Sequence, residues 1–347
     1  LCREGDSLTI TGYAKKNCKL PVLDCGESGS TLRFFVPIAL AMAGGGVFRM
    51  HGRLGQRPMD VYRDLFVPRG VRWRMGVGCD GAAELTVKGE LEAGHYVLPG
   101  NVSSQFVSGL LFALPLLEAG SVLSITSPVE SRPYIEMTRQ AQAMFGVESV
   151  WTDENTLRVF GGQRYEARDA VVEGDWSNGA FFLAANVLGS EIQIDNLSDA
   201  SLQGDRAAAT LLPRLTQQHC TISAADIPDL VPILSIVAAC CHGAVFTDIQ
   251  RLRLKESDRV TSVKNMITAL GGSAEADETT LKIFGTGLTG GTVDCANDHR
   301  IAMSAAIAAT VCREGVLLQG AECVAKSYPD FFEIYRRLGG NYEQYLR

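Results

Sequence analysis

The fold is decided by residues 22–31, which read VLDCGESGST and lead into the apolar segment 32–43. A short apolar strand is followed by a loop of small and polar residues and then by an apolar helix. The same plan returns with strand and loop at 97–105, 171–178, 222–229 and 293–300, and with apolar helices at 106–117, 180–188, 230–239 and 301–311. Strands that alternate with helices predict an α/β fold. Each loop also presents a helix N-terminus, whose free N–H groups and partial positive charge favour anions.

A second pattern, Leu-x-Ile/Val-x-Gly, recurs at 8–12, 85–89, 157–161 and 281–285 and predicts a strand that ends in a turn. Before three of these strands a predicted helix ends near a glycine, at Gly70, Gly146 and Gly271, where a left-handed residue is expected. The complete repeating unit is therefore strand, helix, strand, helix, strand, strand (βαβαββ). We expect the unit that opens the chain to be incomplete.

Two domains are expected from the length of 347 residues and from the distribution of the repeats. The units that end at Gly89 and Gly161 would form a first domain, residues 1–171, and the later units a second domain of similar design, residues 172–347. No Pro- or Ser-rich linker marks the boundary, which favours a tight hinge. A cleft between two such domains is the expected place for a ligand.

The composition excludes several classes of protein. A net charge of −7 argues against a nucleic-acid-binding protein, so any anion site must be a local cluster of Arg and Lys. Ten cysteines occur without a C-x-x-C pair, which indicates reduced thiols and a cytoplasmic location. No apolar run approaches the roughly 18 residues that a membrane span needs. We predict neither a metal site nor a cofactor.

Four predicted helices begin after loops that carry cations, at 57–60, 131–134, 255–259 and 326–330. A cation at the already positive end of a helix lowers the stability of that helix unless an anion is bound, so these loops favour a ligand. Lys255 and Arg259 are four residues apart and are predicted to share one helical face. A solvated, salt-bridged helix start is the alternative interpretation of that segment.

Taken together, these motifs resemble the EPSP synthase family over essentially the whole chain. The resemblance rests on Gly29, Arg57-Pro58 and the segments 103–105, 226–229, 254–259, 297–303 and 325–330, which follow the family's order and spacing. The family transfers the enolpyruvyl group of phosphoenolpyruvate to the 5-hydroxyl of shikimate 3-phosphate, releases phosphate and is the target of glyphosate. The resemblance implies a transferase of aromatic amino-acid biosynthesis, built as a two-domain inside-out α/β barrel, and we expect a monomer.

The resemblance also assigns roles to individual residues. It assigns phosphoenolpyruvate binding to Gly29, Arg57, Gln105, Arg259, Arg300 and Lys326. It assigns shikimate 3-phosphate binding to Ser103, Ser104, Gln105, Ser131, Tyr134, Asp229 and Lys255. Asp229 would be the base toward the 5-hydroxyl, and Glu256 would handle the proton exchanged at the methylene carbon. Simple helix capping is the alternative role for Ser104, Ser131 and Asp229.

Two alternative functions stay open. The family's opening segment, which carries a Lys-Ser or Lys-Thr pair and a nearby arginine, is absent from this sequence. A catalytically silent fragment that only binds substrates is therefore one alternative. The other is UDP-N-acetylglucosamine enolpyruvyl transferase, which is less favoured because its reactive cysteine lies in a loop that here reads HGRLGQ at 51–56. The loop 27–33 also differs from the Asn-Ala-Gly-Thr form common in the EPSP synthase family.

Overall fold

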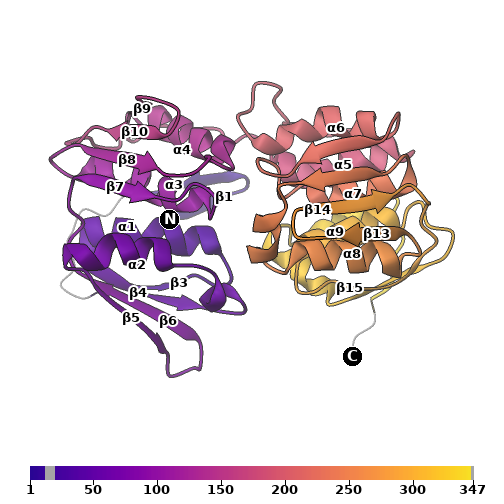
Figure 1. The fold of residues 1–347 in the computed structure, drawn as a ribbon, viewed down its shortest axis with the longest axis horizontal. Coiled ribbons are helices and arrows are strands. Elements are labelled where there is room, and N and C mark those ends of the chain that lie inside the picture. The colour runs from indigo at the N-terminus through magenta and orange to yellow at the C-terminus, as the bar shows by residue number, and fades with distance from the viewer. Residues whose placement is uncertain (12–19, 345–347) are drawn as a thin grey trace.

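The molecule has two lobes that lie side by side (Figure 1). The computed structural model describes residues 1–11 and 20–344, so the glycine of the pattern at 8–12 lies outside the described residues. The buried apolar side chains form two separate clusters, one between Cys25 and Val159 and the other between Ala180 and Tyr335. Within the described ranges, no helix has the length and apolar character that a membrane crossing requires.

Three four-stranded sheets share one topology. In the first sheet, β3 (Val22–Asp24) and β4 (Gly45–Met50) are parallel, β6 (Ala83–Lys88) is antiparallel to β4, and β5 (Arg72–Val77) pairs with β6. The second sheet has the same order, with β7 (His95–Leu98), β8 (Ser121–Ile125), β10 (Thr156–Val159) and β9 (Ser149–Trp151). The third consists of β11 (Cys220–Ser223), β12 (Ala244–Thr247), β14 (Thr280–Phe284) and β13 (Ser273–Ala276). The predicted βαβαββ plan is confirmed for these units.

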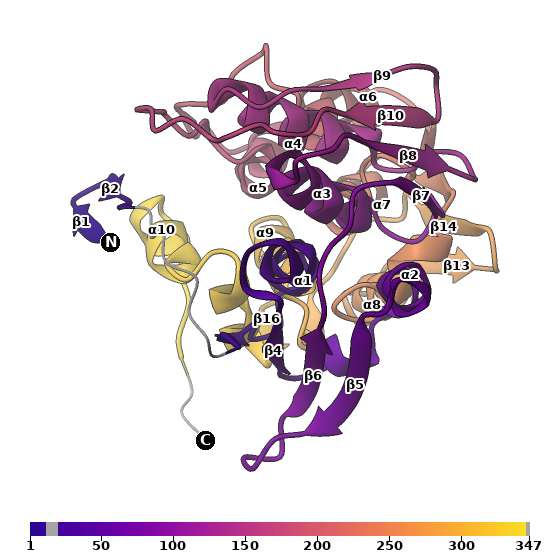
Figure 2. The same ribbon diagram turned by 90° about the vertical axis from the view of Figure 1, so that its left-hand side faces the viewer.

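The apolar helices begin at the small and polar loops that predicted them. They are α1 (Gly29–Ala43), α3 (Ser104–Ala113), α5 (Trp176–Val187), α7 (Val231–Cys240) and α9 (His299–Ala308). All but α7 are capped by a Ser or Asp side chain that accepts a backbone hydrogen bond, namely Ser28, Ser103, Asp175 and Asp298. Helices α1 and α3 lie between the two sheets of the first lobe (Figure 2). A helix that is apolar on every side belongs in such an interior position.

The helices that follow the cationic loops are α2 (Asp60–Phe66), α4 (Arg132–Met144), α8 (Arg259–Ala269) and α10 (Phe331–Arg337), and a further helix is α6 (Ala208–Leu215). The three predicted terminating glycines have φ angles of 83° at Gly70, 80° at Gly146 and 82° at Gly271. These left-handed residues confirm the predicted ends of α2, α4 and α8 to within a few residues.

One predicted strand is not formed. Residues 171–174 were expected to open the third copy of the repeat, but the structure assigns no strand there, and Val171 and Val172 are 88% and 86% exposed. The segment around Asn196 lies beside residues 171–174. Among the described residues, one backbone hydrogen bond joins the two segments, from the N–H of Gly174 to the carbonyl of Asn196 at 2.8 Å. A strand needs a continuous ladder of such bonds. The strand prediction was wrong because it rested on the apolar composition of the segment alone.

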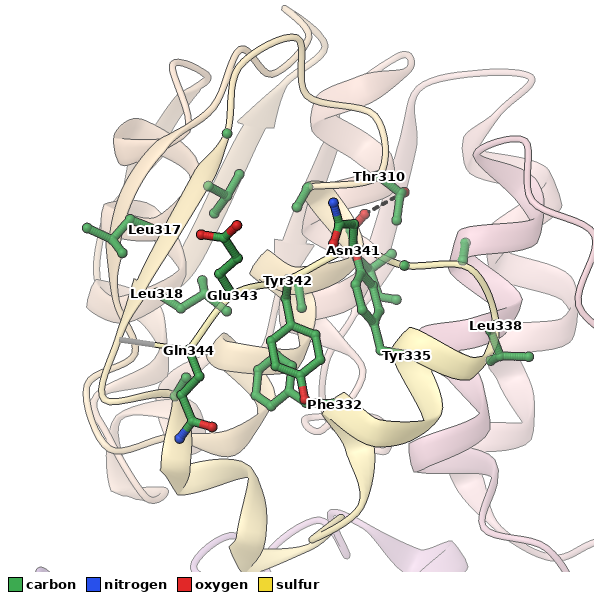
Figure 3. Close-up of a pocket in the computed structure, with 18 of the residues that line it drawn as sticks. Thr310, Leu317, Leu318, Phe332, Tyr335, Leu338, Asn341, Tyr342, Glu343 and Gln344 are labelled. Carbon is green, nitrogen blue, oxygen red and sulfur yellow. Dashed lines mark hydrogen bonds between the residues drawn. The ribbon is translucent and has the colours of Figure 1, made fainter. Parts of the chain in front are cut away.

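The last pair of strands has an open edge. Strands β15 (Gly291–Asp294) and β16 (Val316–Gln319) are parallel, and β16 has no second partner among the described residues. Beside it lies a cavity of about 1480 Å³, lined by β16, α10 and residues 338–344 (Figure 3). In the three complete sheets, the corresponding edge holds the antiparallel strand β6, β10 or β14. A shorter hairpin, β1 (Cys2–Glu4) with β2 (Ser7–Thr9), stands exposed near the N-terminus.

Helices α1 and α3 approach each other closely at Gly109. A Cβ atom built there would overlap the hydroxyl of Tyr62 and the carbonyl oxygen of Arg33. The Tyr62 hydroxyl lies 2.9 Å from the carbonyl oxygens of both Arg33 and Phe106, and therefore ties the two helices together. Glycine is the residue that allows this approach.

We expect Gly109→Ala to lower the free energy of unfolding by about 1–3 kcal/mol, because the added methyl group must displace packed backbone and a buried hydroxyl. Chemical denaturation monitored by circular dichroism would measure the change. Gly315→Ala is the matched control, since a Cβ atom at Gly315 would meet no atom within 4 Å. Equal stability of the two variants would contradict the close approach.

Candidate active site

Polar side chains from the two lobes meet at loops and first turns of helices. Contacts that cross between the lobes include Arg57 Nη1 to Glu256 Oε1 at 3.5 Å, Tyr134 Oη to Asp229 Oδ2 at 3.4 Å, Arg251 Nη1 to Ser131 Oγ at 2.9 Å, and Lys326 Nζ to Glu27 Oε2 at 2.8 Å. Most of these residues belong to the segments that the sequence singled out. The structure thus brings together positions that are up to 299 residues apart in the chain.

Arg259 is the centre of this cluster. It is the first residue of α8 and only 1% exposed, yet it contacts three carboxylates. Its Nε donates to Asp298 at 2.8 Å, its Nη2 donates to Glu256 at 2.6 Å, and its Nη1 donates to Asp229. Burial by itself lowers the pKa of Arg259, but the carboxylates outweigh burial and raise that pKa well above its ordinary value. The guanidinium is therefore permanently charged and fixed in orientation.

Asp229 is surrounded by cations. Besides Arg259, its carboxylate lies 3.3 Å from Lys255 Nζ and 3.6 Å from Arg300 Nη2. Burial raises the pKa of Asp229, but Arg300, Lys255 and Arg259 together hold it well below its usual range. Burial also raises the pKa of Glu256. The neighbouring cations Arg259, Lys255 and Arg57 outweigh burial, so the pKa lies below its ordinary value. Both carboxylates are ionised at neutral pH.

In this region one local prediction is wrong, and the alternative role of Asp229 as a helix cap is not supported. Lys255 and Arg259 do not share a helical face, because α8 begins only at Arg259 and Lys255 is extended with ψ −160°. Asp258 caps α8 instead, and the common contact with Asp229 is what brings the two cations together. Asp229 is not an N-cap either, since Leu230 occupies that position of α7 and no side chain caps the helix.

The serines of the predicted acceptor set have different local roles. Ser103 caps α3 by accepting from the backbone N–H of Gln105 at 3.3 Å, and Ser104 is buried in the first turn. Ser131 has a φ angle of 56° and makes no cap hydrogen bond. Its hydroxyl donates to the carbonyl of Ala225 at 3.3 Å and accepts from Arg251 at 2.9 Å, so it contacts the opposite lobe.

In the first lobe, Gly29 lies against two guanidinium groups. A Cβ atom at Gly29 would come within 2.8 Å of Arg33 Nη1 and 3.0 Å of Arg57 Nη1. Arg33 donates to Gln105 Oε1 at 2.8 Å and is 2% exposed, without any carboxylate partner among the described residues. Burial, reinforced by the nearby charge of Arg57, lowers the pKa of Arg33 to about 9. Two adjacent cations with so little negative charge around Arg33 form a site suited to an anion.

Lys326 lies beside this cluster rather than inside it. Its Nζ donates to Glu27 Oε2 and to the carbonyl of Asn297, each at 2.8 Å. The chain segment 297–298 links Lys326 to Arg259, because Lys326 donates to the carbonyl of Asn297 and Arg259 donates to Asp298. Asn297 also donates its side-chain amide to Glu27 at 3.2 Å.

Several residues of the cluster were given no role from the sequence, among them Arg33, Asp298 and Asp205. Arg33 follows Gly29 by four residues, and Asp298 precedes Arg300 by two. Their closeness in the sequence to predicted site residues is a signal that could have identified both as members of the site. Asp205 belongs to no motif and has no comparable signal, yet it lies 3.3 Å from the Tyr134 hydroxyl. Among the described residues, no group of three or more His, Cys, Asp or Glu side chains is placed to hold a metal ion.

Comparison with known proteins identifies related sequences. Residues 2–335 match the family model described as EPSP synthase (3-phosphoshikimate 1-carboxyvinyltransferase). A 3-phosphoshikimate 1-carboxyvinyltransferase of Clostridium botulinum (strain Alaska E43 / Type E3) is 38% identical over 370 residues, which cover 99% of this chain and 85% of the relative. The enzyme of the same name from Clostridioides difficile (strain 630) is 38% identical over 342 residues, which cover 93% and 78% of the two chains.

Solved structures show the same fold at lower identity. An EPSP synthase from Acinetobacter baumannii superposes with a TM-score of 0.72 at 21% identity and covers 93% of this chain and 80% of its own. The enolpyruvyl transferase NikO from Streptomyces tendae gives a TM-score of 0.65 at 17% identity, with 89% and 76% covered. The mixed α/β architecture is therefore that of the enolpyruvyl transferases.

Proposed function

The chain belongs to the EPSP synthase family, the 3-phosphoshikimate 1-carboxyvinyltransferases, and we propose that the charged cluster between its lobes is the active site. There, the enolpyruvyl group of phosphoenolpyruvate would pass to the 5-hydroxyl of shikimate 3-phosphate, with release of phosphate. The observation that carries this proposal is the convergence of cations from both lobes on a buried cluster in a protein whose net charge is −7. Many of these cations are paired with carboxylates, but Arg33 has no carboxylate partner among the described residues and lies beside Arg57, and this excess of positive charge favours an anionic ligand.

Phosphoenolpyruvate is proposed to bind Gly29, Arg57, Gln105, Arg259, Arg300 and Lys326. Guanidinium groups match carboxylate and phosphate oxygens in pairs, and Gly29 leaves room for Arg33 and Arg57 to lie close to its backbone. Shikimate 3-phosphate is proposed to bind Ser103, Ser104, Gln105, Ser131, Tyr134, Asp229 and Lys255. Hydroxyl groups can hold a phosphate without adding charge, and Ser131 and Tyr134 already reach toward the second lobe.

The proposed chemistry uses two carboxylates. Asp229 would remove the proton of the acceptor hydroxyl, and Glu256 would exchange the proton at the methylene carbon of the donor. Asp229 is held by Lys255, Arg259 and Arg300 in the free protein. Anionic substrates would compete for these cations, and the pKa of Asp229 would rise toward a value better suited to a base.

The two lobes are proposed to be domains, residues 1–171 and 172–347, that close over the substrates. Helices inside and sheets outside support an inside-out α/β barrel in each lobe. The crossing contacts are mostly ion pairs and hydrogen bonds, which substrate can replace without exposing a large apolar surface. We also propose a cytoplasmic monomer, in keeping with free cysteines and with the family resemblance.

Phosphate release tests this function. Phosphoenolpyruvate and shikimate 3-phosphate are supplied together and singly, and released phosphate is measured alongside substrate binding by calorimetry. Release that requires both substrates supports the proposal. Binding of both without release favours the alternative of a catalytically silent binding protein. No binding of either substrate contradicts the assignment of the cluster.

We expect Arg57→Lys to raise the KM for phosphoenolpyruvate about 10- to 100-fold, because an ammonium group cannot replace the paired hydrogen bonds of a guanidinium. Steady-state kinetics with saturating shikimate 3-phosphate would measure the effect. Arg63→Lys is the control, since Arg63 is 48% exposed in its side chain and pairs only with surface carboxylates. A KM within twofold of wild type would remove Arg57 from the donor site.

A further inference from the structure

Asp205 is a buried carboxylate with no role in the proposed chemistry. It lies in the turn before α6 and is 3% exposed. Its Oδ2 accepts from the hydroxyl of Ser177 at 2.5 Å and lies 3.3 Å from the hydroxyl of Tyr134. Its other oxygen, Oδ1, is buried and has no hydrogen-bond partner among the described residues. Leaving one oxygen buried and unpaired costs an ionised carboxylate more free energy than it costs a neutral carboxyl group.

Tyr134 joins Asp205 to the proposed base. Its hydroxyl lies 3.3 Å from Asp205 Oδ2 and 3.4 Å from Asp229 Oδ2. A tyrosine hydroxyl carries one hydrogen, so it can donate to only one carboxylate at a time. Both contacts are hydrogen bonds at once only when one of the two carboxyl groups is protonated. The arrangement Asp229–Tyr134–Asp205 can therefore hold one shared proton.

The surroundings of the two carboxyl groups are unequal. Asp229 touches Lys255, Arg259 and Arg300, whereas Asp205 has no cation within hydrogen-bond distance among the described residues. Burial and the charge of Asp229 raise the pKa of Asp205 to about 6, against the opposing effect of Arg300 and Lys255. Two carboxyl groups whose environments separate their proton affinities suit a division into base and proton holder.

We propose that Asp205 is a positioning residue for the proton of the reaction: it receives through Tyr134 the proton that Asp229 removes from the acceptor hydroxyl. This inference rests on the proposed function. In the addition step, the acceptor oxygen bonds to C2 of phosphoenolpyruvate and its proton goes to Asp229. C3 gains a proton from Glu256, which takes that proton up from solvent once the anionic substrates compete for the cations Arg57, Lys255 and Arg259 that keep it ionised in the free protein. Asp229 then donates to Tyr134 while Tyr134 donates to Asp205, so one proton moves and the tyrosine stays neutral.

The second half of the reaction reverses this transfer. The C–O bond to phosphate breaks with its electron pair leaving on phosphate, and the methyl carbon returns a proton to Glu256. The proton held by Asp205 passes back through Tyr134 and Asp229 and leaves with the phosphate. All carboxyl groups then have their starting protonation, and no further reactant is needed.

The proton shared between Asp205 and Asp229 can be tested in the resting protein, without measuring catalysis. Infrared difference spectra of the full chain, recorded from pH 5 to 8, should show a protonated carboxyl band that grows as the pH falls through about 6. Asp205→Asn should remove this band. Tyr134→Phe should keep it and shift its midpoint upward, because the charged form of Asp205 loses a donor. A wild-type spectrum without the band, or an Asp205→Asn spectrum that retains it, would contradict the proposal that Asp205 holds the shared proton.

The role in turnover is tested by the pH profile of phosphate release. Wild-type kcat should fall as the pH drops through about 6, since protonated Asp205 cannot accept another proton. Asp205→Asn and Tyr134→Phe should lose this inflection and have kcat lowered at least about tenfold. Asp199→Asn, an exposed Asp in the preceding loop, should keep the wild-type profile. A reduced kcat with the inflection intact would make Asp205 merely structural. If the wild-type protein shows the infrared band but releases no phosphate, the proposed function is contradicted. The shared proton of Asp205 and Asp229 is then still supported.

Discussion

Replacing Arg259 by methionine is expected to lower the free energy of unfolding by about 3–5 kcal/mol, the range found when one partner of a buried ion cluster is removed. Arg259 is 1% exposed and Asp298 is fully buried. Methionine fills a similar volume but leaves Asp229, Glu256 and Asp298 facing one another without their shared cation. Urea denaturation at neutral pH would measure the loss of stability.

The matched control for this variant is Arg253→Met. Arg253 precedes α8 by a few residues and pairs with Asp258 at 3.4 Å, but its side chain is 36% exposed. A surface pair of this kind contributes about 0–1 kcal/mol. If Arg259→Met unfolded at the same urea concentration as Arg253→Met, the carboxylates would have to be neutral in the native protein, and the electrostatic account of the cluster would be wrong.

Replacing Asp229 by asparagine is expected to lower kcat by about 10²–10⁴, the usual contribution of a positioned general base. Asparagine has nearly the same shape and can still accept from Lys255, Arg259 or Arg300, so substrate binding should change much less than turnover. Phosphate release at saturating substrates would give kcat, and calorimetry would give the binding constants.

Asp226→Asn provides the comparison for Asp229→Asn. Asp226 lies three residues earlier on the same loop, and its side chain is exposed. Its replacement should leave kcat within about twofold of wild type, as expected for a surface change. If Asp229→Asn kept more than a tenth of wild-type kcat, another group would have to remove the hydroxyl proton.

Much of the fold could be predicted because its signals are local. Glycines at 70, 146 and 271 end helices through their own backbone freedom, and the capping side chains at Ser28 and Asp298 act on the adjacent turn. The segment 171–174 failed because a strand depends on a partner elsewhere, which apolar composition does not reveal. The open edge of β16 was unpredictable for the same reason.

The candidate site was predicted less completely. Residues in motifs, such as Arg57, Arg259 and Asp229, do lie close together, but their roles remain predictions. Asp205 was missed because its significance comes only from contacts with Tyr134 and Ser177, 71 and 28 residues away in the chain. The helical spacing assumed for Lys255 and Arg259 failed because the capping aspartate between them stopped the helix from extending backward.

Among the residues that the structure describes, one edge of β16 has no partner strand, and we expect this edge to matter at high protein concentration. A strand with free N–H and C=O groups along one side is a template for a strand of another molecule, and Leu317, 45% exposed, adds an apolar surface beside it. A charged substitution at Leu317 would therefore act on solubility and crystallisation, through colloidal behaviour instead of catalysis.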